Sequence, residues 1–202
     1  VNEIAIICEK LGVSVWEVIR AAASKPFGFM PFYPGPGLGG HCIPIDPLYL
    51  SWKLKAFNYN ARFIELASDV NTHMPEYCVQ RIHRLLNQHR KCVNGSRILV
   101  LGVTYKRDID DVRESPALDI IRLLQIDGAQ VDYADPYVSE LDIEGKKMAA
   151  VVPSLENLGG YDLVAVVTDH SSFDYAMIQA SASLIFDTRN AYKAGADNVF
   201  KL

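Results

Sequence analysis

Residues 97–134 read RILVLGVTYKRDIDDVRESPALDIIRLLQIDGAQVDYA. The stretch opens with a run of apolar residues at 97–103 and closes with a second run at 130–134. Between these runs, residues 115–126 carry apolar side chains at the spacing of a helix. A strand, a helix and a second strand in this order are typical of a βαβ unit with parallel strands. The stretch therefore predicts a Rossmann-like parallel sheet.

The same alternation of strands and helices continues toward the C-terminal end. We expect two further strands, at 163–167 and 184–187, and two further helices, near Leu155 and at 175–180. The alternation begins after Val93-Asn94-Gly95, which is a turn-forming sequence. This change of pattern predicts a division near residue 94 into a helical segment, 1–93, and a Rossmann-like domain, 94–202.

The N-terminal part is predicted to be helical. Apolar residues recur at helical spacing over 2–24, where Ser14 is expected to cap the second of two helices. Helical spacing returns at 48–55 and 61–90, and Pro75 predicts a kink or a break in the second of these stretches. A long helix there is typical of a domain connector or a dimer seam, and two ordinary helices are the alternative. The fold class is therefore α/β, a helical central segment with a long connecting helix followed by a Rossmann-like parallel-sheet domain.

Residues 25–47 are rich in glycine and proline, with six prolines and five glycines. Such a composition is incompatible with a regular helix or a central strand, because proline lacks the backbone N–H that both require. A loop of this length inside a domain is usually functional or disordered. Its aromatic residues, among them Phe27 and Tyr33, favour an ordered, functional loop.

Cys42 follows Gly39-Gly40 in this loop, so its thiol is expected to be sterically open. His41 lies beside it and Asp46 follows four residues later, an arrangement that would suit a nucleophile. The alternative is a buried and inert thiol, which is common for a single cysteine. From the residues alone both interpretations stay open.

The run PGPGLGGHCIPIDP at 34–47 resembles the active-site signature of the UDP-sugar 6-dehydrogenases, a family that includes the UDP-glucose and UDP-N-acetyl-mannosamine dehydrogenases. The preceding FMPFY at 29–33 makes the chain most similar to the UDP-N-acetylglucosamine 6-dehydrogenase branch. Further similar segments extend over essentially the whole chain, at 71–75, 102–106, 111–116 and 186–189. The resemblance implies the central and C-terminal domains of such an enzyme, with a NAD-binding domain earlier in the full protein.

The resemblance also implies the chemistry. The family oxidises the C6 alcohol of a UDP-hexose to a carboxylate with NAD, and the sugar nucleotide expected here is UDP-N-acetylglucosamine. Cys42 would be the nucleophile that captures the aldehyde, and Asp46 would orient or activate the hydrolytic water. The residues expected to bind the substrate are Tyr33, Gly35, Gly37, Gly39, His41, Ile43, Tyr105, Lys106 and Arg189. Arg113 would bind the cofactor, and no metal site is expected.

Several of these residues have a simpler interpretation. Lys106 could be a solvated surface charge, Arg113 could pair with its acidic neighbours, and His41 is expected to be positional rather than a proton carrier. The sequence after the first strand, Gly102-Val-Thr-Tyr, lacks the GxGxxG pattern, so the sheet is not expected to bind NAD by itself. The family's catalytic Lys and Asn would precede residue 2. Its arginine that reaches a neighbouring subunit is also missing, since only Lys25 lies in that segment.

Composition narrows the possible partners. The balance of 20 Lys+Arg against 24 Asp+Glu gives a net charge of −4, and no basic run suggests nucleic acid or a membrane surface. The longest apolar stretches, such as 163–167, are too short to cross a bilayer. We expect a UDP-sugar as the small-molecule partner and a homodimer or higher homo-oligomer.

The four cysteines contain no CxxC pair, which argues against a zinc site or a disulfide scaffold and favours a reducing, cytoplasmic compartment. The first residue is Val1, which suggests a fragment. The rival hypothesis is a non-catalytic module that binds a nucleotide sugar or dimerises. A stand-alone dinucleotide-binding module is disfavoured by the missing glycine pattern.

Overall fold

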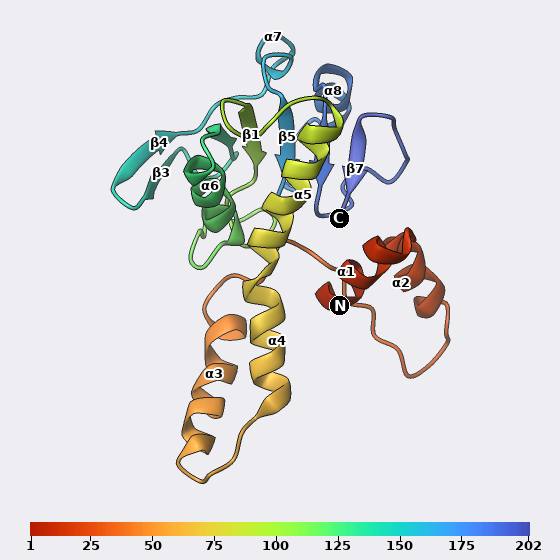
Figure 1. The fold of residues 1–202 in the computed structure, drawn as a ribbon, viewed down its shortest axis with the longest axis vertical. Coiled ribbons are helices and arrows are strands. Elements are labelled where there is room, and N and C mark those ends of the chain that lie inside the picture. The colour runs from red at the N-terminus through yellow and green to blue at the C-terminus, as the bar shows by residue number, and fades with distance from the viewer.

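The computed structural model describes residues 1–202 and has a helical N-terminal part followed by a parallel sheet with helices on both faces (Figure 1). The predicted α/β class is confirmed. The helices of the N-terminal part are α1 (Asn2–Leu11), α2 (Val15–Ala23), α3 (Cys42–Lys55), α4 (Arg62–Thr72) and α5 (Met74–Gln88). Ser14 caps α2 as predicted, since its side chain accepts a hydrogen bond from the backbone N–H of Glu17.

The main sheet has five parallel strands in the order β2-β1-β5-β6-β7. Its strands are β1 (Arg97–Leu101), β2 (Gln130–Ala134), β5 (Leu163–Val166), β6 (Ile185–Asp187) and β7 (Val199–Lys201). Four of these strands were predicted from the apolar runs, whereas β7 was not. A separate antiparallel hairpin, β3 (Glu140–Ile143) and β4 (Lys146–Ala149), was also missed. Glu144 and Gly145 between them both have positive φ, as type I′ hairpin turns require.

The sheet lies between two helical layers, each with its own buried cluster. On one face, α5 and α6 (Pro116–Ile126) pack against β1 and β5, around Ile82, Leu86, Ile121 and Val100 among others. On the other face, α7 (Leu155–Leu158) and α8 (Tyr175–Ser181) cover a second cluster that contains Leu99 and Val164. The central strands β1 and β5 are buried on both faces, because crossover helices of parallel strands lie on both sides of a sheet.

The predicted break at Pro75 is confirmed, and it divides the long helical stretch into α4 and α5. His73 ends α4 and also precedes α5, where Pro75 occupies the first turn. Proline is well tolerated there because the first N–H groups of a helix have no partner within it. α5 shares its buried cluster with the sheet, while α4 has no buried residue. The division into 1–93 and 94–202 stays a prediction, although the packing of α5 associates this helix with the sheet.

One part of the loop prediction is wrong. Residues 25–47 were expected to be irregular throughout, but α3 already begins at Cys42 and includes Pro44 and Pro47. Pro44 is the third residue of the helix, where its missing N–H removes no hydrogen bond. Pro47 costs α3 a single backbone bond, the one its N–H would donate to the carbonyl of Ile43. The helix continues to Lys55, through the residues predicted to be helical.

α3 and α4 form a hairpin that extends away from the sheet, and we call this hairpin the arm (Figure 1). Ser51 Oγ donates to Glu65 Oε1 at 2.8 Å between the two helices, and Lys55 pairs with the same carboxylate. α1 is anchored to α5, because Glu9 accepts a hydrogen bond from Tyr77 and pairs with Arg81.

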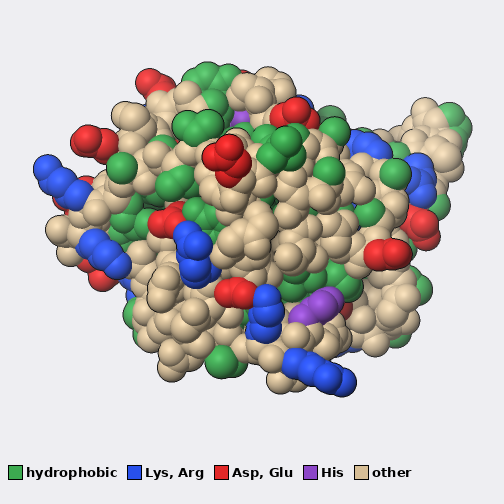
Figure 2. Space-filling view, turned by 90° about the horizontal axis from the view of Figure 1, so that it is seen from above, with side chains coloured by type: hydrophobic (Ala, Val, Ile, Leu, Met, Phe, Trp, Pro, Cys, Tyr) green, Lys and Arg blue, Asp and Glu red, His purple; other side chains and the backbone are tan.

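The molecular face shown in Figure 2 carries acidic and basic side chains interspersed. No helix is long and apolar enough to cross a membrane.

Candidate active site

The Gly-rich loop runs through the junction between the helical part and the sheet. Gly35 donates its backbone N–H to Asn2 Oδ1 at 3.0 Å, and Asn2 Nδ2 donates to Asn71 Oδ1 at 2.7 Å. Residues 34–37 are buried. A buried backbone N–H needs a partner, and here the partner is a side chain from α1 that is itself fixed by α4. The first helix and the arm therefore hold the loop together.

The sheet domain contacts the loop through the segment that follows β1. A Cβ at Gly39 would lie 2.5 Å from Tyr105 Cβ and 2.7 Å from the Glu114 carbonyl oxygen. The backbone N–H of Gly40 donates to the Arg113 carbonyl oxygen at 2.9 Å. Only glycine permits this close approach. The position of the loop immediately before Cys42 is therefore determined by residues 105–114.

Cys42 is the first residue of α3, and its side chain is exposed. The alternative of a buried thiol therefore does not hold. His41 precedes the helix and is exposed, and its side chain makes no capping hydrogen bond. Asp46 is exposed one helical turn after Cys42, and residues four apart lie on the same face of a helix. The thiol and this carboxylate thus share one exposed face at the N terminus of α3.

Arg113 makes a bidentate ion pair with Asp111, from Nε and Nη2, so the neighbour pairing considered from the sequence is present. The pKa of Arg113 is raised, first by its hydrogen bonds to Asp111, and more weakly by Tyr105 and Cys42. The guanidinium of Arg113 is therefore close enough to Cys42 for a weak electrostatic interaction. The positive charge remains exposed and accessible to an anionic group.

Arg189 follows β6 and lies against the other end of the loop. A Cβ at Gly35 would come within 2.6 Å of Arg189 Nη1. The Nε atom donates to the Val167 carbonyl oxygen at 2.7 Å, and the guanidinium forms no ion pair. Burial lowers the pKa of Arg189, while the nearby Asp169 acts in the opposite direction. A largely desolvated cation without an acidic partner is costly, which is typical of a group that binds an anionic ligand.

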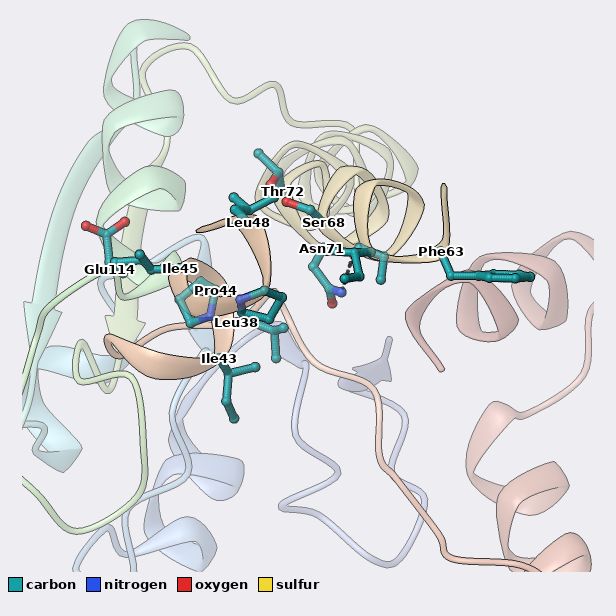
Figure 3. Close-up of a pocket in the computed structure, with 13 residues that line it drawn as sticks. Leu38, Ile43, Pro44, Ile45, Leu48, Phe63, Ser68, Asn71, Thr72 and Glu114 are labelled. Atoms are coloured by element: carbon teal, nitrogen blue, oxygen red, sulfur yellow. Dashed lines mark hydrogen bonds between the residues drawn. The ribbon is translucent and has the colours of Figure 1, made fainter. Parts of the chain in front are cut away.

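Two hollows flank the Gly-rich loop. The first, of about 580 Å³, lies between α3, α4 and Leu38, and its lining is mainly apolar (Figure 3). Ile43 projects from the α3 side, whereas Ser68 and Asn71 come from α4. We call this first hollow the apolar pocket. The second hollow, which we call the charged cleft, has a volume of about 640 Å³ and is more polar. Its lining consists of Tyr33, Pro34, Trp16, Arg20, Asp169, Arg189, Asn190 and Lys193, with Ala23 and Ser24.

The structure brings most of the predicted site residues to this loop. Tyr33 and Arg189 line the charged cleft, and Ile43 lines the apolar pocket. Gly37 packs against Pro116, and Tyr105 packs against Gly39. Lys106 is exposed, and its side chain has no hydrogen-bond or ion-pair partner.

Several residues at the site were not anticipated, among them Asn2, Asn71 and Glu114, and also Arg20 and Lys193 in the cleft beside Tyr33. Asn2 occupies the same helix face as the buried Ala5 and Cys8, so a polar residue on an apolar stripe was the available signal. Asn71 lies within a segment noted only for its family resemblance. Glu114 lines the apolar pocket and has positive φ, for which the sequence offers no signal.

The glycine in the turn after β1 is in close contact with the protein itself. Gly102 has a φ of 79°, and a Cβ there would lie 2.1 Å from the Thr168 carbonyl oxygen. In dinucleotide-binding sheets, the glycines of this turn allow the pyrophosphate to approach the backbone. Here the glycine instead accommodates the end of β5. This glycine therefore serves the packing of the sheet, and the sequence of the turn does not have the GxGxxG pattern.

Comparison with known proteins assigns the class. Residues 1–73 match the central domain of the UDP-glucose/GDP-mannose dehydrogenase family, and residues 99–194 match its UDP binding domain. The chain belongs to the UDP-glucose/GDP-mannose dehydrogenase family.

Individual relatives agree. The chain is 34% identical over 197 residues to a UDP-N-acetyl-D-mannosamine dehydrogenase of Methanococcus maripaludis, covering 94% of this chain and 43% of that protein. It is 35% identical over 173 residues to a UDP-N-acetyl-D-glucosamine 6-dehydrogenase of Pseudomonas aeruginosa, covering 86% and 40%. A solved UDP-D-ManNAc dehydrogenase from Pyrococcus horikoshii superposes with a TM-score of 0.83 at 29% identity, over 99% of this chain and 46% of that one. The chain thus spans less than half the length of these proteins.

Proposed function

We propose that this chain is part of a NAD-dependent UDP-sugar 6-dehydrogenase that oxidises the C6 alcohol of a UDP-hexose, with UDP-N-acetylglucosamine as the preferred sugar nucleotide. The observation that carries the proposal is that one loop connects an exposed thiol with a half-buried arginine that forms no ion pair. Arg189 lies against Gly35, and Cys42 follows seven residues later. A nucleoside diphosphate bound at Arg189 would be anchored while its sugar extends toward the thiol.

The charged cleft beside Tyr33 suits the nucleotide end of such a substrate. Arg189 would bind a phosphate oxygen, because an ion pair formed with a desolvated guanidinium is stronger than one formed in water. Arg20 and Lys193 add positive charge along the same cleft. Lys106, whose side chain is free, would contact a phosphate or a sugar oxygen.

Cys42 would capture the aldehyde stage of the sugar. Its sulfur adds to the C6 carbon, a C–S bond forms, and the carbonyl oxygen takes up a proton to give a thiohemiacetal. Loss of hydride from that carbon, together with loss of the hydroxyl proton, would leave a thioester. Asp46 then orients a water that adds to the thioester carbon, the C–S bond breaks, and the carboxylate leaves while the thiol is restored. The N terminus of α3 favours the negative charge that develops on the sulfur and the oxygen.

NAD would supply the acceptor for the two hydrides. Among the residues of this chain, Arg113 would bind a phosphate of the cofactor. Arg113 would have to exchange or share its ion pair with Asp111 to do so. The two exposed free thiols, Cys42 and Cys92, support a reducing, cytoplasmic setting.

The expected homo-oligomer also stays a proposal. It is supported by the arm, whose apolar side chains are largely exposed, including Trp52 at 71% and Phe63 at 89%. Exposed apolar surface of this extent is typical of interfaces.

The test is Cys42→Ser in the complete protein that carries these residues, assayed with each UDP-hexose and NAD. Release of the sugar acid should fall by at least about a hundredfold, because a serine alkoxide forms less readily and its ester hydrolyses more slowly than a thioester. Cys92→Ser is the matched control, since Cys92 is also exposed but lies outside the Gly-rich loop, where its thiol donates to the Asn94 carbonyl oxygen. Turnover by Cys42→Ser at the rate of the control would refute the covalent mechanism.

A further inference from the structure

His170 is a fully buried histidine at the carboxyl end of the sheet, and the chemistry proposed above makes no use of it. Both of its ring nitrogens have specific partners. Nδ1 receives the backbone N–H of Asp108 at 3.0 Å. Nε2 lies 3.0 Å from Asp135 Oδ2 and 3.1 Å from Thr104 Oγ1. The imidazole thus joins three segments that follow different strands: 103–108 after β1, Asp135 after β2, and its own segment after β5.

The partners determine the tautomer. A backbone N–H can only donate, so Nδ1 must present its lone pair to Asp108. The ring proton is therefore on Nε2, where it points toward the Asp135 carboxylate. Thr104 directs its own hydroxyl proton to the Lys106 carbonyl oxygen at 2.8 Å, which leaves its lone pairs for Nε2. The network is fully satisfied with a neutral ring, and protonation of Nδ1 would break the bond to Asp108.

The ring is also fixed by packing. Tyr137 and Phe173 lie on the imidazole with ring centroids at 5.1 and 5.6 Å. Asp135 accepts the Val103 N–H at 2.8 Å and the Tyr137 N–H at 2.9 Å, so the carboxylate that receives the imidazole proton is held from two sides. A ring flip would place a donor against the Asp108 N–H and is therefore disfavoured.

The segment that His170 holds is irregular and strained. Asp108 has a φ of 60°, which is unfavourable for a residue with a side chain. Its backbone N–H is bound by His170, and its carboxylate accepts the Ser171 N–H at 2.8 Å. Thr168 Oγ1 fixes the start of the same segment by donating to the Thr104 carbonyl oxygen at 2.6 Å. The segment is thus joined to the stretch after β5 through residues 168–171.

This segment carries two residues of the proposed site. Tyr105 packs against Gly39 and Gly40, which immediately precede His41 and Cys42. Lys106 has its carbonyl bound by Thr104 and its side chain in solvent. A shift of the segment would move both the support beneath the Gly-rich loop and the lysine.

We propose that His170, as the neutral Nε2–H tautomer, is a positioning residue that locks residues 104–108 and so fixes Tyr105 and Lys106 against the Gly-rich loop. The role rests on the proposed function, because it concerns the geometry of that site. An apolar core residue could fill the space of the ring but could not satisfy the Asp108 N–H and the Asp135 carboxylate together.

The experiment separates the two nitrogens in the complete protein. In His170→Asn the amide oxygen can replace Nδ1 as the acceptor for Asp108, but the Asp135 contact is lost. In His170→Gln the amide nitrogen can replace Nε2 as the donor to Asp135, but the acceptor for Asp108 is lost. Tyr175→Phe is the matched control, because it removes the bond from Tyr175 to the His170 carbonyl oxygen at 3.0 Å and leaves the ring untouched.

We expect His170→Gln to accelerate amide hydrogen exchange in peptides covering 103–111 and to raise KM for the UDP-sugar about tenfold, the effect of one buried hydrogen bond. The change in kcat should be smaller, and His170→Asn should retain most of the exchange protection. If Tyr175→Phe produces the same changes, or if neither histidine variant alters exchange at 103–111, the proposal is wrong.

A measurement on the unmodified protein covers the case in which the variants do not fold. The ¹⁵N chemical shifts of the His170 ring should show a protonated Nε2 and an unprotonated Nδ1 at neutral pH. A protonated Nδ1 would overturn the proposal. Failure of the proposed function would be recognised separately, as an unmodified protein that binds no UDP-sugar while its His170 tautomer and its protection at 103–111 are as described.

Discussion

The sheet and the arm both carry apolar side chains, but only the sheet buries them. In β1, residues Ile98 to Leu101 are completely buried, and β5 is buried at every position. In the arm, α4 has no buried residue and α3 has only Ser51. The sheet is enclosed by its own helices, whereas the apolar surface of the arm remains in contact with solvent. Since burial of apolar surface is the main driving force for folding, the sheet should be the more stable region.

The candidate site lies where these two regions meet. Cys42 begins the arm, while Tyr105 and Arg189 extend from the stable sheet. The proposed nucleophile thus belongs to the less buried region, and its proposed partners follow strands of the buried sheet. Gly39 and Gly40 contact the segment after β1, so the loop before the thiol rests on the sheet domain.

The largest effect is expected from a methyl group at Gly102. Gly102→Ala should destabilise the sheet by about 3–5 kcal/mol, because the new Cβ would clash with the end of β5 at an unfavourable φ. Gly12→Ala is the matched control in the helical part, since Gly12 has a φ of 68° and nothing within 4 Å. It should cost only about 1–2 kcal/mol, from the backbone conformation alone. Urea denaturation measures the free energy of unfolding of both variants, and peptide-level hydrogen exchange locates the loss. Equal losses of unfolding free energy in the two variants would contradict the steric argument.

The next effect compares leucines in the two regions. Leu86→Ala on α5 removes a side chain that is completely buried against the sheet and should cost about 2–5 kcal/mol. Leu50→Ala on the arm removes a side chain that is 54% exposed and should change the stability by less than about 0.5 kcal/mol. The same denaturation experiment applies. A loss at Leu50 comparable to that at Leu86 would show that the arm is covered in solution.

The sequence predicted well those elements that are determined by local patterns. The apolar runs located β1, β2, β5 and β6, and Pro75 located the break between α4 and α5. The hairpin β3–β4 was missed because its turn, Glu144-Gly145, is not one of the common hairpin pairs. The start of α3 was missed because proline was treated as a helix breaker, although Pro44 lies in the first turn.

The site was predictable only as far as its loop. The run around Cys42 indicated a candidate nucleophile through its glycines and its family resemblance, and the structure shows that this thiol is exposed. The contact of Asn2 with Asn71 joins residues 69 positions apart, and no local pattern encodes such a pairing. The network of His170 likewise depends on the ends of three strands meeting at one edge of the sheet, which follows from topology and not from spacing. Non-local polar contacts were therefore the part that required the structure.

The smallest effect is a pH dependence that distinguishes the two regions. Burial would raise the pKa of Asp135, but hydrogen bonds from His170, Val103 and Tyr137 lower it overall. A carboxyl whose folded pKa is below its unfolded value stabilises the protein above the unfolded pKa, which is about 3.9 for Asp. This stability is lost as the pH falls through the folded pKa.

We therefore expect the exchange protection of the sheet to decline below about pH 4, where carboxylates begin to protonate in the unfolded chain. Asp135→Asn should flatten that decline, because the titrating group is gone. Glu65 on the arm also has a lowered pKa, chiefly through its hydrogen bond from Ser51, but it is exposed to solvent. Glu65→Gln should leave the acid profile of the sheet unchanged, because that group does not contact the sheet core. Hydrogen exchange of the sheet peptides, measured from pH 6 to pH 2.5 in the unmodified protein and in both variants, tests this expectation. An acid profile that Asp135→Asn does not alter would mean that the buried network contributes nothing to the greater stability of the sheet.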